Sequence, residues 1–241
     1  MKIIKVKTIE ELGVTVGNLF IAKIKSKPNA VLGLATGSSP LSTYKYIVND
    51  YKTNNTDWSK VVTFNLDEYK GLDGTHKKSY KYFMNNELFD YINIDKNNTH
   101  IPDGKNTDNP AKYDEKIASY GGIDLQLLGI GINGHVGFNE PGTSFESLTS
   151  IVDLTQSTID ANARFFASKG EVPKQAISMG LKSIMNAKEI ILIASGENKQ
   201  DAIFHLVEGK VSDQWPCSIL QNHPNVTVVI DEAASKKLTT V

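Results

Sequence analysis

Residues 30–49, AVLGLATGSSPLSTYKYIVN, contain the pattern that decides the fold. Residues 30–35 form a short, nearly continuous apolar run, which predicts a strand covered on both faces. A turn containing glycine and proline follows, and residues 41–49 have the pattern of a helix. A buried strand that leads straight into a helix is the repeating unit of a parallel α/β sheet.

The same alternation continues along the chain. We expect further strands and helices in the following segments: strands at 61–66, 124–130, 189–194 and 226–230, and helices at about 79–89, 109–120, 199–208 and after 230. The sequence therefore predicts an α/β fold with a single doubly wound, mainly parallel sheet and helices on both faces, of the Rossmann-like type. Since no linker or repeat interrupts the pattern, we expect a single domain over residues 1–241.

The composition excludes several classes of function. The chain is 40% hydrophobic and 22% charged, which are values of a globular protein. Its net charge of −1 offers no field for nucleic acid or a membrane surface, and no apolar run approaches the roughly 20 residues of a membrane span. The single cysteine, Cys217, can form no intrachain disulfide. With no signal-peptide pattern, we expect a cytoplasmic protein.

In doubly wound folds, ligands bind at the carboxyl ends of the strands. The first such loop contains four small residues, Thr36, Gly37, Ser38 and Ser39. Backbone N–H groups at the start of the next helix, with hydroxyl donors beside them, can cradle an anion. The alternative is an ordinary helix cap, because serine and threonine are preferred there.

Two acids, Asp67 and Glu68, follow the second predicted strand. A carboxylate at a strand end can act as a general base if its surroundings tune its pKa. The alternative is an acid that caps a helix or a turn.

The densest group of polar residues lies in residues 129–142, GIGINGHVGFNEPG. Asn133, His135, Asn139 and Glu140 stand there among five glycines. Histidine transfers protons near neutral pH, and a neighbouring amide or carboxylate can fix its tautomer. The sequence shows no metal-ligand spacing, so we expect no metal site. A structural histidine remains the alternative.

Two basic residues complete the candidates. Arg164 is the only arginine among 26 basic side chains, which hints at a site that needs a planar, bidentate group. Lys199 stands near the start of a predicted helix, where a cation is disfavoured unless an anion binds. Both residues could instead be ordinary solvated side chains.

Taken together, several strings of residues resemble the glucosamine-6-phosphate deaminase family (the glucosamine-6-phosphate isomerases). The resemblance extends from about Ile3 to Leu238, in the family's order, through LATGSSP, TFNLDEY, LGIGINGHVGFNEPG, ANARFF, SGENK, VSDQWPCSILQNHP and the last strand followed by DE. It implies an enzyme that converts glucosamine 6-phosphate and water to fructose 6-phosphate and ammonium, without a cofactor. The implied partner is a small-molecule sugar phosphate, and the protein could be a monomer or a homo-oligomer.

The resemblance also implies roles for the candidate residues. Asp67 matches the base that moves a proton between C2 and C1, His135 the residue that opens the sugar ring, and Glu140 its charge partner. Many members of the family have aspartate at the position of Asn133, and asparagine can still orient His135. The substrate phosphate would be held by the loop residues and the basic residues, namely Thr36, Gly37, Ser38, Ser39, Arg164 and Lys199.

Two alternatives share the fold. A 6-phosphogluconolactonase has a similar G-x-x-G-H loop. In lactonases, however, we expect the residues after that histidine to differ from VGFNEP, which occupies residues 136–141 here. A sugar-phosphate-sensing regulator would carry a DNA-binding module before the domain, whereas the first strand is expected to begin by Lys2. Both are therefore less favoured than the deaminase.

Overall fold

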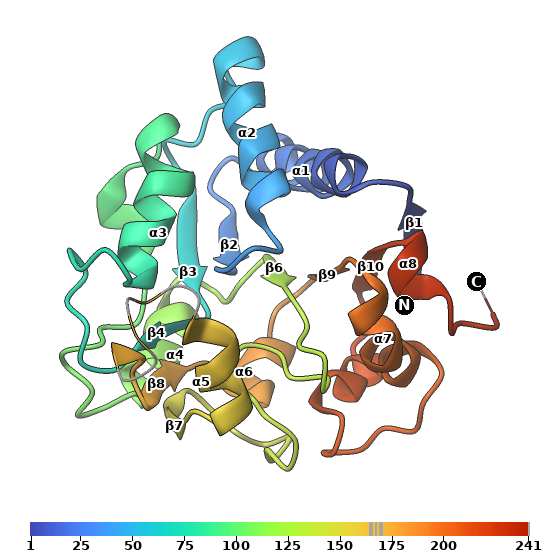
Figure 1. Ribbon diagram of the computed structural model, residues 1–241. Coiled ribbons are helices and arrows are strands. Elements are labelled where there is room, and N and C mark those ends of the chain that lie inside the picture. Colours follow the sequence, from blue (N-terminus) through green and yellow to red (C-terminus); the bar gives the residue numbers. More distant parts are fainter. Residues whose placement is uncertain (164–165, 167, 169–170, 241) are drawn as a thin grey trace.

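The computed structural model describes residues 1–163, 166, 168 and 171–240 (Figure 1). A seven-stranded sheet, in which every neighbouring pair is parallel, runs through the middle of the molecule. The strands are rich in valine, isoleucine and leucine, and the inner ones are buried on both faces. Their order across the sheet is β1 (Lys2–Val6), β10 (Val226–Asp231), β9 (Ile190–Ala194), β6 (Leu125–Leu128), β2 (Val31–Leu34), β3 (Val62–Asn65) and β5 (Thr99–His100).

Helices cover both faces of this sheet, as predicted. Above it in Figure 1 lie α1 (Ile9–Ser26), α2 (Leu41–Asn54) and α3 (Tyr80–Glu87); below it lie α4 (Ala111–Ser119), α6 (Leu181–Met185) and α7 (Gln200–Val207). Helix α1 begins where the Thr8 hydroxyl accepts the N–H of Glu11, and its apolar positions form one buried stripe. The short α8 (Glu232–Ser235) follows β10.

The strand order reverses between β2 and β6. From β2 the chain proceeds outward to β3 and β5, and it then returns to β6 on the other side of β2 and continues to β9 and β10. The loops after β2 and β6 therefore lie next to each other. A Cβ placed on Gly129 would lie 3.7 Å from the Cβ and Oγ of Ser39. Such a switch point is where doubly wound folds bind ligands.

The structure adds a second, three-stranded antiparallel sheet that the sequence analysis did not anticipate. It consists of β4 (Asp67–Tyr69), β8 (Gln175–Ser178) and β7 (Ser150–Asp153), in the order β4-β8-β7. The chain leaves the main sheet after β3 and enters β4 two residues later, where Asp67 pairs with Ser178. This small sheet fixes the backbone of Asp67 beside the end of the main sheet.

The sequence analysis also did not predict α1, α5 (Gln156–Asn162), α6 or β5. The elements that it did predict differ from the structure at their ends. Helix α2 continues to Asn54, beyond the expected end at residue 49. The helix expected to begin at Lys199 begins at Gln200, after a 3₁₀ turn, η5 (Glu197–Lys199). In the part of the chain that the structure describes, no helix is long and apolar enough to span a membrane.

Candidate active site

His135 lies in the loop that follows β6, at the switch point. Its imidazole packs directly on the backbone of Gly131, because a Cβ placed there would lie 2.2 Å from the ring atoms Cε1 and Nδ1. The Gly131 N–H also donates to the carbonyl of His135 at 2.8 Å, which closes the loop. Glycine is therefore needed at residue 131 to let the ring approach the main chain.

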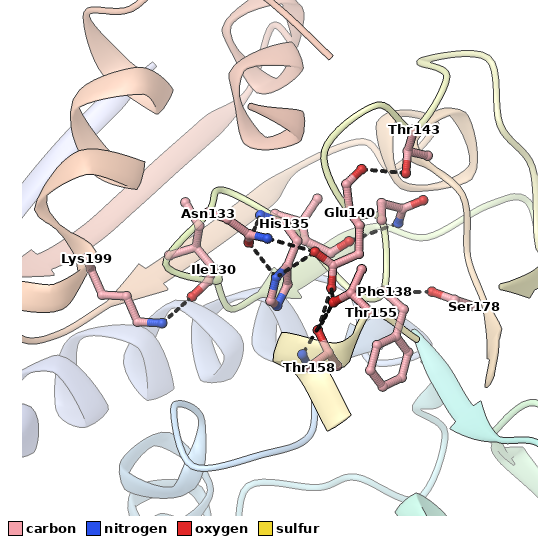
Figure 2. A network of polar contacts seen from close by, with 12 residues as sticks. Ile130, Asn133, His135, Phe138, Glu140, Thr143, Thr155, Thr158, Ser178 and Lys199 are labelled. Atoms are coloured by element: carbon pink, nitrogen blue, oxygen red, sulfur yellow. Dashed lines mark hydrogen bonds and ion pairs between the residues drawn. The ribbon is translucent and has the colours of Figure 1, made fainter. Parts of the chain in front are cut away.

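Asn133 fixes the tautomer of His135. The Asn133 Nδ2 donates to Glu140 Oε2 at 2.7 Å, so the amide oxygen Oδ1 faces the other way. This Oδ1 lies 2.7 Å from His135 Nδ1, and because an amide oxygen can only accept, the network assigns the ring proton to Nδ1. The lone pair of the neutral ring is then on Nε2. Figure 2 shows the three side chains as one connected network.

The electrostatic surroundings keep His135 neutral. Burial lowers the pKa of His135 below its ordinary value; the charge of Glu140 opposes this effect, and that of Lys199 adds to it. Glu140 Oε2 is 3.7 Å from Nδ1. A neutral ring with a carboxylate beside it can accept a proton and hold it briefly.

Asp67 is a buried acid next to the same loop. It is only 6% exposed, and burial raises the pKa of its carboxyl to about 8, with a further contribution from the charge of Glu68. The Oδ2 of Asp67 lies 3.5 Å from the point where a Cβ would stand on Gly137, two residues after His135. Gly137 has φ of 58°, a conformation that favours glycine. The loop that carries the imidazole of His135 therefore lies against the high-pKa carboxyl of Asp67 at Gly137.

The acid beside it, Glu68, caps a helix. Its Oε1 accepts the N–H groups of Tyr69 at 2.9 Å and Tyr80 at 3.0 Å, and its Oε2 accepts that of Lys81 at 3.1 Å. Burial raises the pKa of Glu68 to about 7, although these hydrogen bonds act in the opposite direction. The cap that was weighed as the alternative for both acids thus describes Glu68, at the start of α3.

The loop from Thr36 to Ser39 leads into the N-terminus of α2. Among the described residues, no side chain caps this terminus, whose N-cap position is Pro40. Gly37 has φ of 88°, and a Cβ placed on it would have no atom within 4 Å. The serine and threonine side chains do not act as ordinary caps here, which leaves an N-terminal helix end of the kind that binds anions.

Lys199 contacts the loop that follows β6. Its Nζ donates to the carbonyl of Ile130 at 2.7 Å, and Ile130 follows Gly129, which faces Ser39 (Figure 2). The predicted cation therefore contacts the loop after β6, which itself lies beside Ser39 of the predicted anion loop. Arg164, the other predicted phosphate contact, lies outside the described residues.

Residues 212–217 support the His135 loop, a role that the sequence analysis did not assign. The Cys217 N–H donates to the carbonyl of Gly134, and the carbonyl of Asp213 accepts the N–H of Gly142, each at 2.8 Å. Trp215 packs against Gly134 and stacks on His205 with the ring centroids 3.9 Å apart. In the sequence, this segment stood out only as part of the family resemblance, in the string VSDQWPCSILQNHP, and the resemblance gave it no role.

No group of three or more His, Cys, Asp and Glu side chains within the described residues could hold a metal ion. A cleft of about 780 Å³ is lined by Glu68, His100 and Tyr113, among others, but not by Asp67 or His135. The chemistry of the side chains, rather than this cleft, therefore defines the candidate site.

Comparisons with known proteins show the family of the chain. The family model of glucosamine-6-phosphate isomerases and 6-phosphogluconolactonases matches residues 5–229. A glucosamine-6-phosphate deaminase of Mycoplasma mycoides subsp. mycoides is 56% identical over 99% of this chain and 98% of its own length. One from Clostridium novyi is 52% identical over 99% and 100% of the two chains.

Solved structures give the same result. A monomeric glucosamine-6-phosphate deaminase superposes with a TM-score of 0.95 at 43% identity, over 98% of this chain and 99% of that one. The 6-phosphogluconolactonase of Trypanosoma brucei reaches a TM-score of 0.78 at 16% identity, over 99% and 98% of the two chains, which shows a shared fold alone.

Proposed function

Since the chain belongs to the family of glucosamine-6-phosphate isomerases and 6-phosphogluconolactonases, we propose that Asp67, the His135 loop and the Lys199 region form its active site for a phosphorylated sugar. Of the family's two reactions, the chain catalyses the deaminase reaction. Relatives named glucosamine-6-phosphate deaminase are 51–56% identical over at least 98% of the chain. The products are fructose 6-phosphate and ammonium.

The observation that carries this assignment is the buried carboxyl of Asp67. Isomerisation removes a weakly acidic C–H proton, for which a desolvated carboxylate of raised pKa is a suitable base. Burial raises the pKa of Asp67 to about 8. Hydrolysis of a lactone removes no C–H proton and needs no such group.

His135 opens the sugar ring in the first step. With its proton on Nδ1, the ring has the Nε2 lone pair available to accept the proton of the anomeric hydroxyl. The imidazolium then gives a proton to the ring oxygen as the C1–O bond breaks, which leaves the open-chain aldehyde. Glu140, 3.7 Å from Nδ1, stabilises the transient charge, and Asn133 holds the ring in position.

Asp67 then transfers the proton between the two carbons. The carboxylate takes the C2 proton of the open-chain sugar, the electrons of the C–H bond form a C1–C2 double bond, and those of the C1=O bond move to the oxygen. This oxygen takes a proton from the substrate ammonium, which gives a neutral enolamine. Return of the proton to C1 gives an iminium group at C2, to which water adds, and ammonium leaves. A substrate ammonium beside Asp67 favours the ionised carboxylate, which offsets the raised pKa of the empty site.

The phosphate is bound at the other end of the substrate. Backbone N–H groups at the start of α2 and the hydroxyls of Ser38 and Ser39 donate to its oxygens, and Lys199 supplies positive charge. Arg164 adds the bidentate contact that its guanidinium allows. No step of this mechanism requires a metal or a cofactor.

A comparison of substrates tests the assignment. Purified protein, assayed in EDTA, is offered glucosamine 6-phosphate, unphosphorylated glucosamine and 6-phosphogluconolactone. We expect ammonium from the first at a rate far above that from the second, and no acceleration of lactone hydrolysis. Lactone hydrolysis without ammonium release would reverse the assignment.

We also propose that the protein is a monomer. The support is the structural neighbour, which is a monomeric deaminase, and sedimentation of the purified protein would test the proposal.

A further inference from the structure

The two carboxylate oxygens of Glu140 have different partners. Oε2 faces the His135 loop, where it accepts from Asn133 Nδ2 at 2.7 Å. Oε1 faces helix α5 (Gln156–Asn162), where the hydroxyl of Thr158 donates to it and the hydroxyl of Thr155 lies 3.1 Å away. Figure 2 shows Glu140 between the loop and the two threonines. The carboxylate therefore bridges two segments of the chain.

Thr158 is the more specific of the two donors. A hydroxyl has one proton, and that of Thr155 has two acceptors within reach, Glu140 Oε1 and the Thr158 oxygen at 3.0 Å. The Thr155 oxygen also caps α5 by accepting the N–H of Thr158. The Thr158 hydroxyl donates to Glu140 and is otherwise shielded, since Thr158 is only 7% exposed.

Loss of this donor would leave Oε1 poorly solvated. The Glu140 side chain is 13% exposed, so water has little access to replace a missing hydroxyl. A carboxylate in that situation turns toward other donors or toward solvent, and Oε2 then leaves its position beside Asn133 and His135. The hydrogen bond from Thr143 does not prevent this, because it reaches the main-chain carbonyl of Glu140.

We propose that Thr158, supported by Thr155, is a positioning residue that holds the Glu140 carboxylate toward Asn133 and His135. The proposal rests on the role given above to His135 in ring opening. Thr158 touches no reacting atom and acts through Glu140. Glu140 and Lys199 are the charged groups that act on His135, with opposite effects on its pKa.

The test is a proton NMR titration of His135 in the protein without substrate, together with kcat for ammonium release. In Thr158→Val the pKa of His135 should fall by roughly 0.5–1 unit, because the charge that raises it is displaced. Its kcat should fall about tenfold, less than the roughly 10²–10⁴-fold contributed by a proton-transferring group itself. Thr158→Ala should show the same shift, and Thr158→Ser, which keeps the hydroxyl, should restore the wild-type titration. The His135 signal is assigned by its loss in His135→Gln.

Thr63→Val is the matched control. Thr63 is a fully buried threonine in β3 whose hydroxyl has no hydrogen-bond partner within the described residues, so its removal should leave the His135 titration unchanged. An unchanged titration in Thr158→Val and Thr158→Ala would overturn the proposal. Failure of the proposed function would look different: the wild-type protein would release no ammonium, while the titration shift would still be present.

Discussion

Asn133 Oδ1 lies 2.7 Å from His135 Nδ1 and accepts a hydrogen bond from its N–H, so the ring lone pair faces away from the network, on Nε2. The relationship depends on the other end of the amide, which donates to Glu140. Asparagine suits this position because one side chain is both an acceptor for the imidazole and a donor for the carboxylate. Aspartate, which many members of the family are expected to have here, could donate to Glu140 only when protonated.

We predict that Asn133→Asp raises the pKa of His135. The substitution places a second carboxylate beside the ring and next to Glu140, and added negative charge favours the imidazolium. The shift should be about 1 unit, the effect of one added charge close to the ring. NMR titration of His135 measures it, and a lowered or unchanged midpoint would show that the network is arranged differently.

Gly131→Ala should impair ring opening. A methyl group at residue 131 would lie 2.2 Å from atoms of the His135 ring, so the ring must move. We expect kcat to fall by at least tenfold, with less effect on KM, since the phosphate contacts are elsewhere. Gly129→Ala is the control, because a Cβ there makes contacts of 3.7 Å, an ordinary distance. Equal activity of the two variants would contradict the close packing of His135 on Gly131.

Asp67→Asn should stabilise the protein at alkaline pH. The pKa of Asp67 is about 8 in the folded protein and about 3.9 in an unfolded chain, so between these values the folded state binds the additional proton. Stability therefore falls as pH rises through this window, and a neutral amide avoids the loss. At pH 8 the gain should be at least about 1.4 kcal/mol, the equivalent of one pKa unit. It should largely disappear at pH 4. Thermal unfolding at both pH values measures it, and an equal gain at both would point to a packing effect.

Lys199→Ala should change both substrate binding and the pKa of His135, because both depend on the charge of Lys199. The KM for glucosamine 6-phosphate should rise about 10–100-fold, since a charge-assisted hydrogen bond is worth about 1.5–3 kcal/mol. The pKa of His135 should also rise, because the charge of Lys199 lowers it. Lys236→Ala removes an exposed lysine that is paired with Glu197, in the same 3₁₀ turn as Lys199, and should change neither quantity. An unchanged KM in Lys199→Ala would show that Lys199 does not bind the substrate phosphate.

The main sheet and the loops that carry chemistry could be predicted because their signals are local. Apolar runs predicted the parallel strands other than the two-residue edge strand β5, and the rule of strand ends pointed to Asp67, His135 and Lys199 as candidates. Strand β4 could not be predicted, because a three-residue strand has no period of its own and depends on pairing with β8.

Contacts between distant segments of the chain also could not be predicted from the sequence. The Glu140–Thr158 hydrogen bond joins residues 18 positions apart, and the separate roles of Asp67 and Glu68 depend on where α3 begins. The proton on His135 was assigned only from the orientation of the Asn133 amide, which follows from Glu140.

The most direct test of the account is the rate of ammonium release from glucosamine 6-phosphate by the wild-type protein and by Asp67→Asn. The account predicts release of ammonium and fructose 6-phosphate by the wild type. It predicts a rate lower by about 10²–10⁴-fold in the variant, which remains folded because an amide has nearly the volume of a carboxylate. Activity of the variant within a few-fold of wild type would contradict the assignment of Asp67 as the base.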